Sequence, residues 1–201
     1  MSQLLSEQEL IRRDKLTQLV QLGFTPYPAA TFPVTHTAAS IKEGYQGEQN
    51  KADFTNVCLA GRIMSIRDMG KASFAVIQDS TGKIQIYLKR DDLCPGDDKQ
   101  LYDTVWKHLT DIGDIIGIKG YVFTTKTGEI SLHVSSFTLL TKSLKPLPVV
   151  KEKEGETYDA VSDPEFRYRQ RYADLIVNPE VKDTFRKRTL LMNTIRSFLN
   201  E

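Results

Sequence analysis

The chain of 201 residues is long enough for one mid-sized domain with flanking helical segments. Apolar residues make up 40% and charged residues 26%, which supports a hydrophobic core and excludes wholesale disorder. Because 27 basic residues stand against 26 acidic ones, the net charge of +1 excludes binding of nucleic acid through bulk positive charge, and any such contact has to come from a local site.

The first element expected is a helix over residues 6–22. Ser6 and Glu9 have the spacing of a capping box, and Gly23 lies where a glycine that ends a helix is expected. Its apolar residues are spaced for one helical face: Leu10, Leu16, Leu19 and Val20. A proline-rich passage follows, and then a possible short helix near residues 38–45.

From about residue 55 to 140 the apolar residues recur at every second position, which predicts strands. Five strands are expected, at 56–67, 72–79, 83–90, 114–124 and 129–140. Glycine-containing turns separate them, and a helix over 100–109 lies between the third and the fourth. This order predicts an OB-fold, a five-stranded Greek-key barrel and a mainly β fold. Gly61 suits the bend or bulge that a long first strand needs to serve two sheet edges.

After residue 140 the pattern changes to an extended linker over 144–148 and a charged run over 151–156, and two helices are expected at 163–176 and 180–200. The last helix carries an apolar stripe: Val181, Phe185, Met192, Ile195 and Leu199. The chain is therefore divided into an N-terminal helical extension (1–54), a barrel domain (55–143) and a linker with the start of a further, truncated domain (144–201).

Other classes of protein are disfavoured. The apolar runs are far shorter than the roughly 18 residues of a membrane helix, and no signal peptide is visible. Cys58 and Cys94 form no CxxC pair, which argues against a disulfide framework or zinc site and fits a reducing cytoplasm. Cys58 alternates with apolar neighbours and is expected to be a buried thiol, and Trp106 is expected in the core.

Barrels of this kind bind single strands on the face of strands two and three. At that place Phe74 offers an aromatic ring on which a base can stack. The amide of Gln85 can form hydrogen bonds with both a donor and an acceptor of a base, and Arg67 and Lys71 contribute positive charge in the adjacent loop. The corresponding face of strand five carries two further candidates, Glu129 and His133.

Each candidate also has an ordinary structural explanation. Phe74 is equally compatible with a place in the barrel core. An exposed glutamine is more often solvated than a ligand, loop cations are more often surface charges, and Glu129 is more often a cross-strand charge partner. His133 is more often satisfied by local partners than catalytic.

The segments GKASFAVIQD (70–79), GKIQIYLKRDDL (82–93), LLTKSLKPLP (139–148) and FRYRQRYADLI (166–176) closely resemble class II lysyl-tRNA synthetases of the bacterial type. The resemblance runs from the first helix to the final residue and implies an N-terminal fragment with an anticodon-binding barrel and the opening of a catalytic domain. It also implies that Phe74 stacks on the central anticodon uridine, that Arg67 and Gln85 read the edge of that base, and that Glu129 contacts a neighbouring base. The segment 149–165 is longer than in many members.

The resemblance further implies tRNA as the partner, a homodimer and the use of ATP and magnesium in the full-length enzyme, and no membrane. The chain itself carries no ATP- or lysine-binding motif that we recognise, so it is expected to hold no cofactor and to be inactive alone. Two alternatives remain at this point: a free-standing OB-fold protein that binds single strands, and a pure interaction module. The first would be expected to carry a basic excess, whereas residues 56–140 contain 10 basic and 10 acidic side chains.

Overall fold

In a computed structural model, the chain is described over residues 5–148, 151–153, 156–158 and 163–200. It divides into two compact units, Met1–Pro146 and Leu147–Glu201. The first contains the barrel, and the second contains a short hairpin and three helices.

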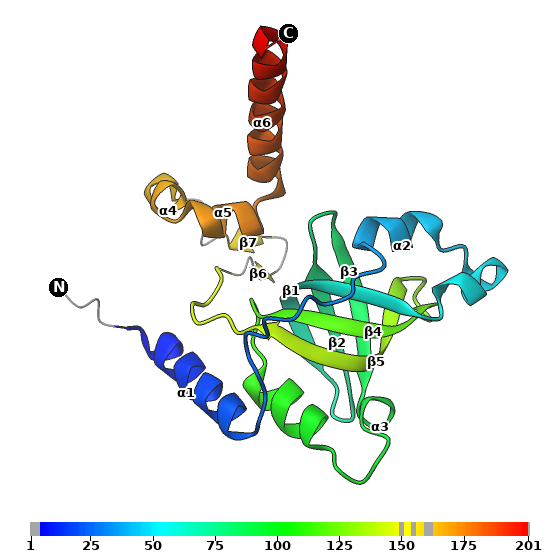
Figure 1. The fold of residues 1–201 in the computed structure, drawn as a ribbon. Helices are drawn as coiled ribbons and strands as arrows, with labels where there is room; N and C mark the ends of the chain where they lie inside the picture. Colours follow the sequence, from blue (N-terminus) through cyan, green and yellow to red (C-terminus); the bar gives the residue numbers. More distant parts are fainter. Residues whose placement is uncertain (1–4, 149–150, 154–155, 159–162, 201) are drawn as a thin grey trace. The chain divides into compact units, whose positions relative to one another are not determined.

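The barrel consists of the five expected strands, β1 (Val57–Asp68), β2 (Ala72–Gln78), β3 (Lys83–Lys89), β4 (Ile115–Thr124) and β5 (Ile130–Thr141). They close in the order β1-β2-β3-β5-β4, in which only the β3–β5 pairing is parallel. This is the OB-fold predicted from the sequence, and Figure 1 shows the strands wrapped around one another. Gly70 and Gly128 adopt positive φ in the two turns where the sequence placed them.

The long strand β1 serves two edges of the barrel, as expected. Its first half pairs with β4 and its second half with β2, and Arg62 pairs with both. The bulge lies between Ile63 and Ser65 rather than at Gly61. Gly61 is instead a place of close approach, since a Cβ there would lie 3.0 Å from the carbonyl oxygen of Gln78.

Helix α1 (Glu7–Gln21) begins with the expected capping box of Ser6 and Glu9, and Gly23 follows its end with φ 83°. The expected apolar stripe is wrong in two positions. Leu19 is fully buried, but Leu10 and Val20 are 55% and 59% exposed. The face that packs on the barrel unit carries Arg12 instead, whose guanidinium donates to the carbonyl oxygens of Ile112 and Ser143.

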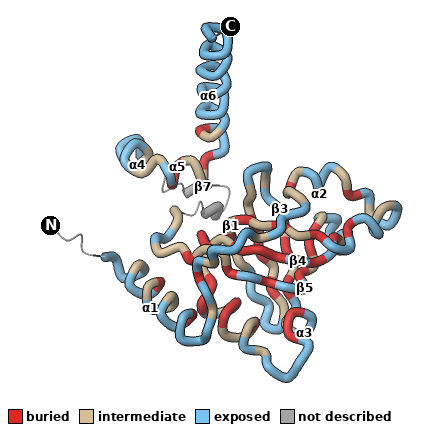
Figure 2. The backbone as a smooth tube through the Cα atoms, in the orientation of Figure 1, coloured by how far each residue is buried: buried red, intermediate tan, exposed pale blue. Residues whose placement is uncertain are grey.

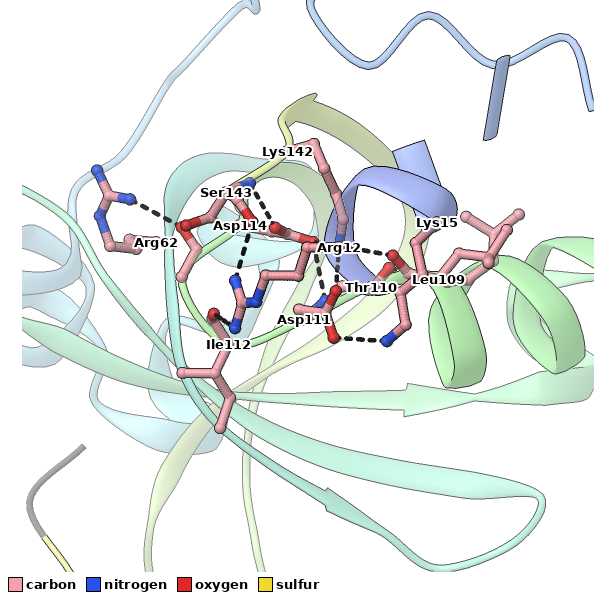
Figure 3. Close-up of polar contacts among 12 residues, drawn as sticks. Arg12, Lys15, Arg62, Leu109, Thr110, Asp111, Ile112, Asp114, Lys142 and Ser143 are labelled. Carbon is pink, nitrogen blue, oxygen red and sulfur yellow. Dashed lines mark hydrogen bonds and ion pairs between the residues drawn. The ribbon is translucent and has the colours of Figure 1, made fainter. Parts of the chain in front are cut away.

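A polar cluster joins α1 to the end of β5 (Figure 3). The fully buried Lys142 ammonium donates to the Leu109 carbonyl and pairs with Asp111 and Asp114. Lys15 of α1 pairs with the other oxygen of Asp111 at 2.6 Å. Burial raises the pKa of the Asp114 carboxyl even against the opposing charge of Lys142. The cluster therefore depends on Lys142 to compensate a buried carboxylate.

The barrel interior is a continuous apolar core, coloured red along the strands in Figure 2. The expected helix over 100–109 is present as η3 (Leu101–Leu109), a π-helix, and it brings Trp106 and Tyr102 into this core. Helix α2 (Ala38–Gly44) is the expected short helix, whereas the 3₁₀ turns η1 (Gly47–Gln49) and η2 (Lys51–Phe54) were not foreseen. Cys58 is half-buried, not buried as expected, because it alternates with the inward Val57 and Leu59.

In the second unit the helix expected at 163–176 is two helices, α4 (Pro164–Arg169) and α5 (Arg171–Val177), which meet at Gln170, whose φ of −119° and ψ of 53° are not helical. Arg167, Arg171 and Asn178 all donate to the buried carboxylate of Asp174. Helix α6 (Pro179–Asn200) is the second expected helix. Only Val181 of its stripe is buried.

The charged run of the linker contains two short paired strands, β6 (Lys151–Lys153) and β7 (Glu156–Tyr158), where the sequence predicted no regular structure. The rest of the segment 149–165, expected from the resemblance to be long, lies partly outside the described residues. Within residues 5–148, 151–153, 156–158 and 163–200, no helix combines the length and the apolar character needed to cross a membrane.

Candidate nucleic-acid interface

The outer face of the barrel carries a row of side chains that crosses all five strands. The register places Arg67 opposite Phe74, Phe74 opposite Tyr87, and Tyr87 opposite His133. Tyr121 of β4 continues the row beside His133. Since directly opposed residues in neighbouring strands point to the same face, side chains far apart in the sequence are brought together here.

A second row lies on the same face, two residues away from the first along each strand. It contains Val76, Gln85, Ser131 and Phe123, which are opposed in pairs from β2 to β4. The two rows together form a surface with aromatic rings in the middle and amide, hydroxyl and charged groups around them.

Phe74 belongs to this outer surface and not to the core. Its neighbours Ser73 and Ala75 point inward and are buried, whereas Phe74 is half-buried. Its ring centroid lies 4.9 Å from that of Tyr87, and the Tyr87 ring lies 6.0 Å from that of Phe123. The alternative that Phe74 fills the barrel interior is therefore wrong.

These rings line a cavity of about 680 Å³ on the outside of the barrel. Its lining residues are Arg67, Met69, Ala72, Phe74, Gln85, Tyr87, Phe123, Thr125, Lys126 and Thr127. Two of them are cationic and none is acidic, so the cavity favours an anionic ligand. Its aromatic walls offer faces for a flat ring, and the Gln85 amide offers a donor and an acceptor.

Three of the residues predicted from the sequence, Arg67, Phe74 and Gln85, line this one cavity. Gln85 is anchored by its cross-strand neighbour, because its Nε2 donates to the Oγ of the buried Ser131 at 2.8 Å. The adjacent acid Asp68 is paired with Lys107 at 3.2 Å, which offsets its charge beside Arg67.

The other three predicted residues do not line the cavity. Lys71 is exposed in the turn between β1 and β2. Glu129 lies just before β5, half exposed, and its carboxylate is 3.9 Å from the ammonium of Lys42. Glu129 is thus a charge partner, but not the cross-strand one considered from the sequence, because Lys42 belongs to helix α2.

His133 is enclosed by neighbours. Its ring stacks on Tyr121 with centroids 4.7 Å apart, and its Nε2 pairs with Asp92 at 3.1 Å. Its Nδ1 is buried and has no hydrogen-bond partner among the described residues. Burial lowers the pKa of the His133 imidazole, although the neighbouring Asp92 opposes this shift. It supports the aromatic row rather than facing the cavity.

Four residues of this surface are not among the candidates predicted from the sequence: Tyr87, Phe123, Lys126 and Ser131. The signal for Phe123 was its alternation with Tyr121 along the fourth strand, combined with the strand order of the fold. Within the described ranges, no group of three or more His, Cys, Asp or Glu side chains could hold a metal ion.

Comparison with known proteins agrees with this geometry. Residues 57–140 match the tRNA anticodon family of OB-fold nucleic acid binding domains. Over 197 residues the chain is 58% identical to the lysine–tRNA ligase of Porphyromonas gingivalis W83, a match of 98% of this chain and 34% of that protein.

Two further relatives give the same result. The lysine–tRNA ligase of Azobacteroides pseudotrichonymphae is 56% identical over 197 residues, covering 98% of this chain and 39% of the relative. That of Christiangramia forsetii is 56% identical over 200 residues, covering 99% and 34%. The chain thus spans little more than a third of the length of the curated relatives it matches.

Proposed function

Because residues 57–140 belong to the tRNA anticodon family of OB-fold domains and nearly the whole chain is similar to part of lysine–tRNA ligases, we propose that the barrel binds the anticodon loop of a lysine tRNA. The observation that carries the proposal is the cavity in which Arg67, Phe74 and Gln85 meet. The similarity over the whole chain favours this function over a free-standing single-strand binding protein or an interaction module.

In the proposed complex the central base of the anticodon, a uridine, stacks on Phe74. Stacking on an aromatic side chain is worth roughly 1–3 kcal/mol per base. Gln85 and Arg67 contact the edge of the base, which gives identity, while Lys126 and Arg67 lie close enough to the cavity mouth to attract the backbone phosphates.

The remaining predicted residues have secondary roles in this proposal. Glu129 contacts a neighbouring anticodon base once it leaves Lys42, and Lys71 contributes positive charge to the approaching loop. His133 does not contact the RNA in this proposal; its ring packs against Tyr121 and Tyr87 and holds them in place.

The full-length protein is proposed to be a cytoplasmic, homodimeric ligase that joins lysine to tRNA with ATP and magnesium. The described side chains do not fit a magnesium site, because they contain no group of three or more His, Cys, Asp or Glu that could hold a metal ion. We expect the 201-residue chain alone to show no lysine-dependent exchange of pyrophosphate with ATP.

A titration tests the proposed function. The chain is titrated at one fixed salt concentration with a labelled anticodon stem-loop of lysine tRNA, and then with a stem-loop in which the same loop nucleotides are permuted. We expect binding at least about tenfold tighter for the natural loop, which corresponds to one recognised base at 1–3 kcal/mol. Equal affinities would contradict the proposal and indicate sequence-independent binding.

A further inference from the structure

Ser131 lies next to Gln85 on the outer face of the barrel and contacts its amide. The two residues are opposed in the parallel pairing of β3 and β5, and Ser131 is fully buried. Its hydroxyl oxygen takes part in two hydrogen bonds: it accepts from Gln85 Nε2 at 2.8 Å and donates to the carbonyl oxygen of Glu129 at 3.3 Å.

The carbonyl group of Glu129 determines the direction of these two hydrogen bonds. A serine hydroxyl has one proton, and a backbone carbonyl can only accept. While that proton is used toward Glu129, Ser131 accepts from Gln85, and the amide presents Nε2 to it. A flipped amide would place Oε1 against the hydroxyl oxygen. The hydroxyl would then have to turn its proton away from Glu129, whose carbonyl also accepts from the Thr125 N–H, so the flipped orientation costs the Ser131–Glu129 bond.

Orientation of this amide decides which pyrimidine edge it matches. Uridine presents an acceptor at position 4 and a donor at N3, whereas cytidine presents a donor at position 4 and an acceptor at N3. Suppose that a base is held in one pose on an aromatic platform. A half-turn of the amide then exchanges Oε1 and Nε2, and an amide that is complementary to uridine becomes complementary to cytidine. A freely flipping glutamine would accept both.

We propose that Ser131 is a positioning residue that fixes the orientation of the Gln85 amide and thereby sets the discrimination of uridine against cytidine in the cavity. This inference rests on the proposed function. Among the described residues Gln85 Oε1 has no partner, so the acceptor and the second amide hydrogen remain available to a base in the cavity that Gln85 lines.

The experiment compares the affinities of the chain for two stem-loops that differ only in uridine or cytidine at the central anticodon position. The wild type should prefer uridine. Ser131→Ala should reduce that preference by about tenfold, the equivalent of one hydrogen bond of about 1.4 kcal/mol, with a smaller change in affinity for uridine itself. Ser131→Thr keeps the hydroxyl and should retain the preference. An unchanged preference in Ser131→Ala would overturn the proposal.

A double variant separates positioning from a general structural effect. In a Gln85→Ala background, Ser131→Ala should leave the uridine-to-cytidine ratio unchanged, because Ser131 acts only through Gln85. A further loss in that background would overturn the proposal. If Ser131→Ala does not fold, Ser131→Cys replaces it, since a thiol has similar size but is a weak acceptor. Ser131→Cys should also lose the preference for uridine over cytidine. If it retains that preference, the proposal is wrong.

The outcomes distinguish this proposal from the one on which it rests. If the wild type binds natural and permuted loops equally, the proposed function fails. If the wild type discriminates uridine from cytidine and Ser131→Ala does so equally well, the proposed function stands and the role of Ser131 is wrong.

Discussion

The aromatic rings of Phe74 and Tyr87 lie against each other on the outside of the barrel, with centroids 4.9 Å apart and planes inclined by 42°. Phe123 also lies close to Tyr87, with ring centroids 6.0 Å apart, so the three rings support one another. A platform supported in this way loses little conformational entropy when a base stacks on it. The arrangement is that of a preformed site for a flat ligand.

The first prediction concerns this platform. Phe74→Ala should weaken binding of the lysine anticodon stem-loop by roughly 1–3 kcal/mol, the value of one base stacked on an aromatic ring. The measurement is a titration monitored by fluorescence anisotropy. Phe74→Tyr is the matched control, and it should bind nearly as well as the wild type because it keeps the ring.

Thermal unfolding of the same variants tests whether Phe74 instead stabilises the fold. Phe74 lies on the outer face, so its removal should not cost the 3–5 kcal/mol typical of a deleted core phenylalanine. A loss of stability of that size with unchanged affinity would mean that Phe74 supports the fold and not the ligand.

The second prediction concerns the buried ammonium of Lys142. Lys142→Met should destabilise the chain by roughly 3–5 kcal/mol, because it leaves the carboxylate of Asp114 buried without its counter-charge. Urea unfolding measures the difference. Lys51→Met is the control: it removes an exposed pair with Glu48 and should cost less than about 1 kcal/mol. Equal stability of the two variants would refute this role of Lys142.

The third prediction concerns Gly120 in β4. A Cβ at this position would lie 1.9 Å from the backbone carbonyl oxygen of His133, beside the irregular pairing between β4 and β5. Gly120→Ala should therefore force the strands apart and destabilise the barrel by about 3 kcal/mol or more. Gly96→Ala meets open space and should leave the melting temperature almost unchanged. A fully stable Gly120→Ala variant would show that the approach is not so close.

The fourth prediction concerns the pH dependence of stability through Asp79. Burial alone would raise the pKa of this carboxyl, but hydrogen bonds from Ala38, Thr81 and Gly82 outweigh it and hold the pKa below the usual 3.8. A lowered folded-state pKa contributes stability above the unfolded-state value and loses it as the pH falls through the folded-state value.

Comparison of the wild type with Asp79→Asn tests this. At pH 7 the variant should be less stable by about 1–3 kcal/mol, the range for a lost hydrogen bond to a charged group. The difference should shrink as the pH decreases below 3.8, measured by urea unfolding at several pH values. A difference independent of pH would contradict the assignment.

The barrel could be predicted from the sequence because its signals are local. Alternation along Ile84, Ile86 and Leu88 marks a strand with one buried side, and Gly70 and Gly128 mark the turns. The direction in which Phe74 points could not be settled in this way, since the neighbouring Ser73 is polar and buried, which breaks the simple pattern.

Features that depend on distant partners were missed. Arg12 is buried because carbonyl groups about 100 and 131 positions later accept its hydrogen bonds, which no helical periodicity reveals. Ser131 is brought next to Gln85 only by the parallel pairing of β3 and β5. The separation of α4 from α5 likewise depends on the backbone of Gln170, where no proline or glycine marks a break in the helix.

The most direct test of the central claim, that the outer face of β2 and β3 binds the anticodon loop, is a map of backbone amide chemical shifts during titration with the lysine anticodon stem-loop. We predict that the largest changes occur at Arg67, Phe74, Gln85, Tyr87 and Phe123, and that they saturate together at one affinity. Changes confined to residues outside this face, such as α1 or α6, with these five unaffected, would contradict the account.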